Sequence, residues 1–236
     1  RHRSYRLFFC GQSVAVLGNW IQFLAMNWLV YRLSGSAWLL GVTGFAGQIA
    51  ILVLAPFGGL WADRFDRRKL LIWTQAAAMI PGFVLAALAY AGAIEIWHVV
   101  LMASLFGIIM AIDVPVRQSF TPEMVPARED LASAIAFNAL MQNGGRMLGP
   151  TIAGLLIAAS SEAVCFLVNG ASKIAALATL TMMTVTPIVR SRASSSIWGG
   201  LKEGVAYTWN SVPLRLLFPV VAMVSFMASP YQTLMP

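Results

Sequence analysis

Polar side chains recur at helical spacing inside the long apolar runs of this chain. Asn138, Gln142 and Arg146 follow one another at intervals of four residues, and Lys173 follows Asn169 at the same interval. This spacing places each set on one face of a helix. Because a charge in lipid is costly, Arg146 and Lys173 are expected to face the protein interior or a wet cavity that holds a polar molecule. The alternative is that each only neutralises a structural partner, which for Lys173 is an acid outside this chain.

The first apolar run carries further amides that lean to one side, among them Asn19 and Gln22. Amides of this kind either hydrogen-bond between helices or line a cavity and contact a substrate. With Asn138, Gln142, Arg146, Asn169 and Lys173, they are the candidate cavity residues of this sequence.

Asp113 and Arg117 form the clearest acid–base pair within an apolar run. Their spacing of four residues places them on one helix face, about one turn from the predicted end of that helix. The simplest interpretation is an ion pair at the membrane interface. A buried acid that binds a proton in one conformation and not in another also couples protons to movement, and Asp113 is the best candidate for that role.

Enzyme machinery is not expected. The two histidines, His2 and His98, have no partners at the spacing of a metal site or a catalytic triad. The sequence contains no P-loop, so an ATP-driven pump is not predicted. No metal and no cofactor are expected.

The composition places the chain in a membrane. Apolar residues make up 59% of it and charged residues 11%, with a mean hydropathy of +0.76. Soluble domains carry about 25% charged residues. Lipid must therefore replace water over much of the surface. The net charge of +7 does not indicate nucleic-acid binding, because the basic residues lie between apolar runs instead of gathering on one soluble face.

Six apolar windows are long enough to cross a bilayer, and a seventh begins near Leu214 and still continues at Pro236. This pattern predicts an all-α membrane protein. The six windows are Leu7–Val30, Ala37–Ala62, Leu70–Gly92, His98–Val116, Ala134–Ala159 and Ala163–Pro187.

The distribution of Lys and Arg predicts a cytoplasmic N-terminus. With that orientation, Arg32 is the only one of the 16 basic residues in an outer loop, and Arg146 and Lys173 lie inside spans. The rest fall in cytoplasmic segments, including one that holds both Arg117 and Arg128, as the positive-inside rule requires.

Three regions are predicted. Residues 1–187 form a six-helix transmembrane bundle. Residues 188–213 form a cytoplasmic linker, in which Ile197, Trp198, Leu201, Val205 and Trp209 indicate an amphipathic helix at the membrane interface, the alternative being a solvated linker. Residues 214–236 start a second bundle. Because the chain begins without Met and ends in an apolar run, we expect a fragment whose partner is its own C-terminal half.

The turn between the second and third windows carries the most specific motif. Gly59 is followed by Asp63 and Arg64, and then by Arg67, Arg68 and Lys69. This resembles the cytoplasmic loop signature of the major facilitator superfamily, with Asp66 where that family usually has glycine. Gly59 is expected to allow the close approach of another helix. The alternative is an ordinary positively charged loop.

The resemblance implies a charge cluster that holds one conformation of a cytoplasmic gate. An acid at the end of the fourth span joins the loop Asp and the Arg four residues after it. The matching residues here are Asp63, Arg67 and Asp113, with Arg117 beside Asp113.

The fifth window resembles the antiporter signature of the same superfamily. Gly145, Gly149, Pro150 and Gly154 match the motif, and Ala153 replaces one glycine. Small residues are expected to pack this helix against one from the C-terminal half, with a bend at Pro150. The alternative is generic small-residue packing.

Further matches extend the resemblance over nearly the whole chain, to a bacterial exporter branch that includes the enterobactin exporter and macrolide-efflux-type proteins. They include Leu54–Gly59, Asp113–Gln118, Glu123–Val125 and Cys165–Gly170. The resemblance implies the N-terminal half of a twelve-helix major facilitator fold, cut in its seventh helix.

The function that follows is secondary export of small drug- or siderophore-like molecules from the bacterial inner membrane, by proton-coupled antiport. The alternatives are a non-transporting scaffold or receptor, or an importer of the same fold.

Overall fold

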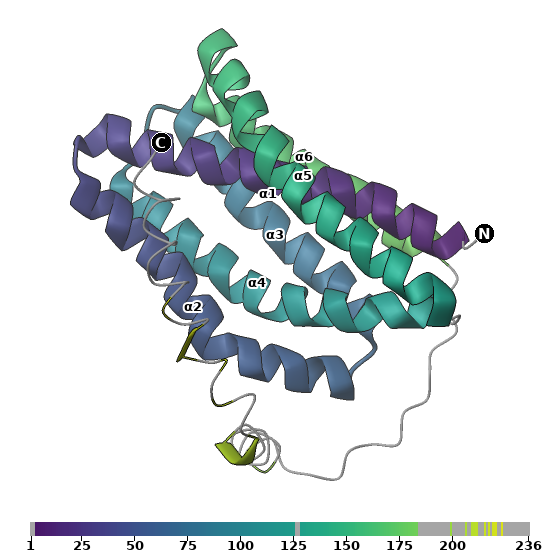
Figure 1. Ribbon diagram of the computed structural model, residues 1–236. Helices are drawn as coiled ribbons and strands as arrows, with labels where there is room; N and C mark the ends of the chain where they lie inside the picture. Colours follow the sequence, from purple (N-terminus) through teal and green to yellow (C-terminus); the bar gives the residue numbers. More distant parts are fainter. Residues whose placement is uncertain are drawn as a thin grey trace.

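In the computed structural model, every regular element of the described residues is an α-helix (Figure 1). These residues are 3–125 and 128–183, with single positions between 199 and 223. The six helices are α1 Arg3–Ser34, α2 Ala37–Arg64, α3 Arg67–Tyr90, α4 Ile96–Met124, α5 Arg128–Ala159 and α6 Glu162–Met182. The predicted linker at 188–213 and seventh span at 214–236 lie outside the continuously described ranges.

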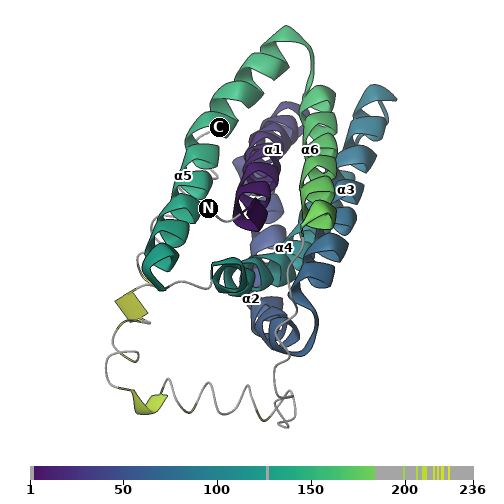
Figure 2. The same cartoon turned by 90° about the vertical axis from the view of Figure 1, so that its right-hand side faces the viewer.

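The helices form a curved row. α5 packs on α1, α1 on α6, α6 on α3, α3 on α4, and α4 on α2. In Figure 2, α5, α1, α6 and α3 follow one another across the view and α4 and α2 lie below them, so α5 and α2 form the two free edges of the row. α1 makes few contacts with α2 and α4, so space remains inside the curve.

Glycine allows the closest crossing in the row, between α2 and α4. A Cβ atom at Gly107 of α4 would collide with the carbonyl of Gly47, and one at Gly58 of α2 would collide with the carbonyl of Ala111. These contacts bring the two backbones together, which larger residues would prevent.

Two apolar clusters hold the helices together, one near each end of the bundle. One contains Phe8, Leu71, Val116, Phe120 and Leu180, near the N-terminal end of α1. The other lies near the opposite end and contains Ile21, Leu29, Leu85, Val99 and Phe166. Each cluster contains residues from four or more helices, so side-chain packing fixes the helices at both ends of the bundle.

Five of the six helices are long and apolar enough to cross a membrane, and α5 is the exception. The sequence predicted a full span there as well. Asn138, Gln142, Asn143 and Arg146 lie along the middle of α5 and lower its mean hydropathy. A helix that carries polar groups at this depth needs protein or water beside it.

The fourth helix is longer than predicted. The sequence ended it at Val116, but α4 continues to Met124, so Asp113 lies about three turns before its end instead of one. Arg117 is therefore part of α4 and does not belong to the segment that follows this helix. The predicted window ended at Val116 because polar residues follow it. The hydroxyl groups of two of them bond within the helix: Ser119 donates to the carbonyl of Pro115, and Thr121 donates to that of Arg117.

Two other boundaries differ for local reasons. α3 begins at Arg67, three residues early, because the Asp66 carboxylate accepts a hydrogen bond from the Lys69 amide at 3.1 Å and caps the helix. This gives Asp66 a structural role at the position where the family usually has glycine. α6 ends at Met182, five residues before the predicted Pro187, ahead of a β-branched run and a proline that disfavour helix.

Candidate functional site

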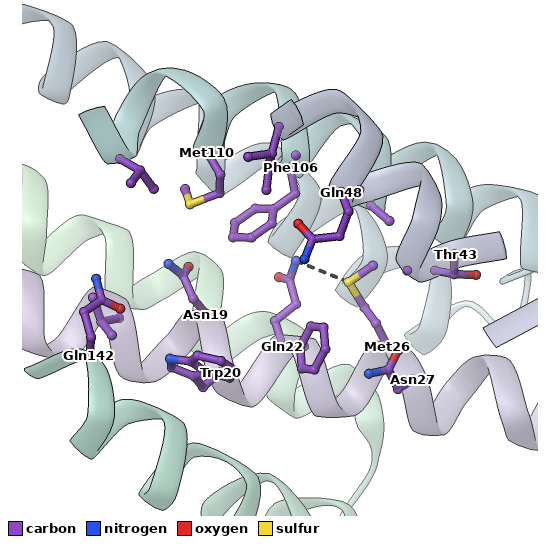
Figure 3. Close-up of a pocket in the computed structure, with 18 of the residues that line it drawn as sticks. Asn19, Trp20, Gln22, Met26, Asn27, Thr43, Gln48, Phe106, Met110 and Gln142 are labelled. Atoms are coloured by element: carbon purple, nitrogen blue, oxygen red, sulfur yellow. Dashed lines mark hydrogen bonds between the residues drawn. The ribbon is translucent and has the colours of Figure 1, made fainter. Parts of the chain in front are cut away.

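A cavity of about 480 Å³ lies inside the curved row, between α1, α2, α4 and α5. Figure 3 shows Asn19 and Gln22 of α1 facing Phe106 and Met110 of α4 across this space, with Gln142 reaching it from α5. Its polar lining consists mainly of amides. They are Asn19, Gln22, Asn27, Gln48, Gln118 and Gln142, joined by Thr43 and Arg117.

Two predicted cavity residues, Asn169 and Lys173 of α6, lie behind the α1 wall instead of in the lining. Both are fully buried. The Lys173 ammonium donates to the Ala15 carbonyl at 3.1 Å and to the side-chain oxygen of Asn19. Asn169 donates to the side-chain oxygen of Gln22 at 2.6 Å. The two residues of α6 therefore hold two of the lining amides of α1, Asn19 and Gln22, in place.

The predicted polar stripe of α5 divides. Gln142 lines the cavity, whereas Asn138 donates to the Thr121 hydroxyl at 2.9 Å and lies near Tyr5. Arg146 is exposed and does not line the cavity. Helical spacing correctly placed the three on one side, but it does not show which part of that side reaches the cavity.

Asp113 is fully buried at the edge of the cavity. One carboxylate oxygen accepts hydrogen bonds from the Thr74 hydroxyl and the Gln75 amide of α3, both at 2.8 Å. The other lies 3.1 Å from the Arg117 guanidinium, without the alignment of a hydrogen bond. Arg117 lines the cavity, so the pair connects the cavity wall to α3.

Arg67 is the centre of a second charge network, at the end of the bundle. Its guanidinium lies 3.2 Å from Asp63 and 2.9 Å from Glu123 of α4. It also donates to the carbonyls of Ala62 and Ser119. Four contacts from one side chain fix the turn between α2 and α3 against the end of α4.

The structure therefore contains two charge networks where the resemblance implied one. Asp113 lies ten residues before Glu123 on α4, which is about 15 Å along the helix. Asp113 contacts Thr74 and Gln75 on α3 and Arg117 on its own helix, and the acid of α4 beside Arg67 is Glu123. The unexpected length of α4 explains the difference.

Three further residues of the loop motif, Arg68, Arg64 and Gly59, lie at or near the turn between α2 and α3. Arg68 donates to the carbonyls of Leu180 and Thr181, both at 2.8 Å, and so caps the end of α6. Arg64 is exposed at the end of α2. The close helix approach expected at Gly59 occurs at its neighbour Gly58. A Cβ at Gly59 would meet nothing within 4 Å in the described part of the chain.

The glycines of the fifth-helix motif face α1. A Cβ at Gly145 would lie 2.9 Å from Trp20, and one at Gly149 would collide with the same side chain. The expectation that these two glycines face a helix of the C-terminal half is wrong. Gly154 is exposed, and a Cβ atom there would meet nothing within 4 Å among the residues that the structure describes. Pro150 lies within α5.

Sequence reasoning missed Glu123, Thr74 and Trp20. Glu123 lies in Glu123–Val125, one of the stretches that resemble the family. The sequence pattern does not indicate that its carboxylate contacts Arg67, 56 residues earlier in the chain. An aromatic residue such as Trp20, opposite two glycines on another helix, cannot be found from either helix alone. Among the described residues, no three His, Cys, Asp or Glu side chains gather as metal ligands.

Comparison with known proteins supplies the family. The model of the transmembrane secretion effector family, of the major facilitator superfamily, matches residues 1–236. The staphyloferrin A transporter of Staphylococcus aureus is 27% identical over 98% of this chain and 58% of its own length. The macrolide efflux protein A of Streptococcus pyogenes is 23% identical over 93% of this chain and 59% of its own.

The multidrug efflux pump Tap of Mycolicibacterium fortuitum is 24% identical over 92% of this chain. The chain spans 55–59% of the length of these three relatives. The all-helical architecture, the apolar helices and the family match over the whole chain all indicate a membrane protein of this family. The chain is a multi-pass membrane protein that belongs to the transmembrane secretion effector family of the major facilitator superfamily.

Proposed function

We infer that this chain forms one half of a secondary exporter of small molecules that works by alternating access. The observation that carries the proposal is the cavity between α1, α2, α4 and α5, which is lined by amides inside an otherwise apolar bundle. Fixed polar groups in an apolar cavity are characteristic of small-molecule sites. Two of the relatives, a macrolide efflux protein and a multidrug efflux pump, support export.

The two free edges of the row are the surfaces on which the second half docks. Leu52 on α2 is 73% exposed, and Leu155 on α5 is 67% exposed. Apolar edges on both sides of an open cavity fit a second bundle that completes it. Rocking of one half against the other then opens the cavity to each side of the membrane in turn.

Asp113 is the proposed proton site. Its carboxylate faces Arg117, which lines the cavity, so a proton on Asp113 releases the guanidinium from its ion pair. Substrate in the cavity and a proton on Asp113 therefore both act on Arg117. Antiport follows if the state that holds substrate keeps Asp113 ionised and the state that has released substrate outward takes up a proton there, so that a proton enters only as substrate leaves.

The proposed orientation has the N-terminus and the Arg64–Lys69 turn in the cytoplasm of a bacterium, with the bundle in the inner membrane. The distribution of basic residues supports it. A cysteine at position 66, probed with an impermeant thiol reagent, reacts in everted vesicles and not in intact cells if this orientation is correct.

Everted membrane vesicles with the full-length gene product test transport. Respiration acidifies their interior, and the wild type should then accumulate at least one member of a panel of antibiotics and dyes that includes carboxylates. Nigericin, which removes the pH gradient, and Asp113→Asn should both abolish accumulation, whereas the control Asp66→Asn, which keeps a capping side chain, should not. Accumulation that survives nigericin would contradict proton coupling. Uptake in the opposite direction would identify an importer, and no accumulation of any compound would favour a scaffold or receptor.

A further inference from the structure

The cavity wall has an unbalanced charge. Arg117 is the only ionisable side chain in the described lining, which contains no carboxylate. Asp113 neutralises Arg117 across 3.1 Å and is itself bound by Thr74 and Gln75. Lys173 is fully buried behind the wall, and none of the ion pairs among the described residues includes it.

Lys173 adds a second cation on the α1 side of the cavity. Its ammonium group donates to the Ala15 carbonyl at 3.1 Å and to the side-chain oxygen of Asn19, a lining residue. With Lys173 protonated, Arg117 and Lys173 stand against the one carboxylate of Asp113, so a net positive charge remains beside the cavity. Such a charge in a low-dielectric interior attracts an anion strongly.

Asn19 and Gln22 of α1 are oriented so that they too favour an anion in the cavity. An ammonium group only donates hydrogen bonds, so the Asn19 atom that Lys173 contacts must be the side-chain oxygen. The NH2 group of Asn19 is then left for the cavity that this residue lines.

Gln22 is oriented by a similar chain of contacts. The Ser172 hydroxyl lies near the side-chain oxygen of Asn169, whose NH2 group donates to the oxygen of Gln22 at 2.6 Å. The Gln22 NH2 group has only a weak acceptor, the Met26 sulfur at 3.6 Å (Figure 3). Asn19 and Gln22 therefore present donors to the cavity, with their oxygens already bound from behind.

We propose that the cavity selects organic anions, with the anionic oxygens held by the NH2 groups of Asn19 and Gln22 and by Arg117, in the field of Lys173. Trp20, Phe23 and Phe106 line the same cavity and take the apolar body of the molecule. The preferred ligand is an amphiphilic carboxylate, and an amphiphilic cation is disfavoured because the described lining contains no acid. This proposal rests on the proposed function and specifies its substrate class.

Three fluorescent probes of matched shape test the charge preference: dansylglycine, its neutral carboxamide, and dansyl-ethylenediamine, which carries an ammonium group. The full-length protein in nanodiscs should bind dansylglycine at least about tenfold more tightly than the ammonium probe, the size expected of charge-assisted hydrogen bonds. Asn19→Asp places a carboxylate beside Lys173 and removes the donors, and it should reduce that ratio by about tenfold or more.

Gln142→Glu is the matched control, because it adds the same charge to the cavity lining at a residue that does not accept a hydrogen bond from Lys173. It should change the ratio much less. If Asn19→Asp does not fold, Gln22→Leu removes the second donor without a charge and should weaken dansylglycine binding while the neutral probe is unaffected.

Tighter binding of the ammonium probe by the wild type would overturn the anion preference and leave the exporter proposal intact. Equal ratios for Asn19→Asp and Gln142→Glu would overturn the role of the α1 wall. Failure of all three probes to bind, together with the absence of gradient-driven accumulation in vesicles, would overturn the exporter proposal. Failure to bind with accumulation of other compounds intact would overturn this substrate class alone.

Discussion

The Arg67 guanidinium lies 2.9 Å from the Glu123 carboxylate, and this ion pair joins the first turn of α3 to the last turn of α4. The Arg67 side chain is 5% exposed and that of Glu123 is 12% exposed, whereas Asp63, the other acid beside Arg67, is 62% exposed. Water screens the contact with Asp63 far more than the contact with Glu123. Glu123 is therefore the stronger anchor of this turn.

Glu123→Gln should lower the stability of the full-length protein by about 1–3 kcal/mol, because it leaves a buried guanidinium without its main counter-charge. Asp63→Asn should cost less than about 0.5 kcal/mol, since that pair is largely in water. Thermal unfolding in detergent compares the two variants. A larger loss for Asp63→Asn would contradict the assignment of Glu123 as the main partner.

The gate hypothesis makes a separate prediction for the same turn. Asp63→Asn and Arg67→Ala should reduce transport more than they reduce membrane insertion, because they alter a contact that holds one conformation. Flux per inserted molecule, measured in everted vesicles, is the readout. Unchanged flux in both variants would remove the turn from the gating machinery.

Gly149 and Gly154 provide a matched pair on α5. Leucine at Gly149 would collide with Trp20, and separation of α5 from α1 should destabilise the protein by about 1–3 kcal/mol or more. Leucine at Gly154 points into open space within the described residues and should leave the α1–α5 contact intact. Thermal unfolding and expression level distinguish them, and equal tolerance at both sites would contradict the observed packing of α5 on α1.

Arg68 and Lys69 provide a second matched pair of positions for substitution. Arg68→Ala removes two hydrogen bonds to carbonyls at the end of α6 and should increase amide hydrogen exchange in its last turn, with a loss of about 1–2 kcal/mol of local stability. Lys69→Ala keeps both of these bonds and should leave exchange in α6 unchanged. Equal exchange in the two variants would show that Arg68 does not hold the end of this helix.

Much of the fold could be predicted from the sequence, because a membrane helix is defined by its own apolar length. All six helices were placed, and five of them begin or end within three residues of a predicted boundary, as at Ala37 of α2 and Ala159 of α5. The end of α4 was missed because Arg117, Gln118 and Glu123 resemble a loop in composition. Their helix is stabilised by partners on other helices, such as Arg67.

The site was predictable only in part, for a similar reason. The interval between Asn169 and Lys173 correctly indicated a buried polar face. Their bonds to Gln22 and Asn19 depend on the register between α6 and α1, which neither helix encodes alone. Gly145 and Gly149 likewise show that something approaches closely, while only the fold shows that it is Trp20.

The central claim is that polar residues of α1 and α5 line an aqueous cavity inside a membrane bundle. Cysteine accessibility in permeabilised membranes tests it most directly, in a full-length background without Cys10 and Cys165. Asn19→Cys and Gln142→Cys should react with a water-soluble maleimide, whereas Ile80→Cys, on the exposed outer side of α3, should not. Reaction at position 80 with none at positions 19 and 142 would contradict the account.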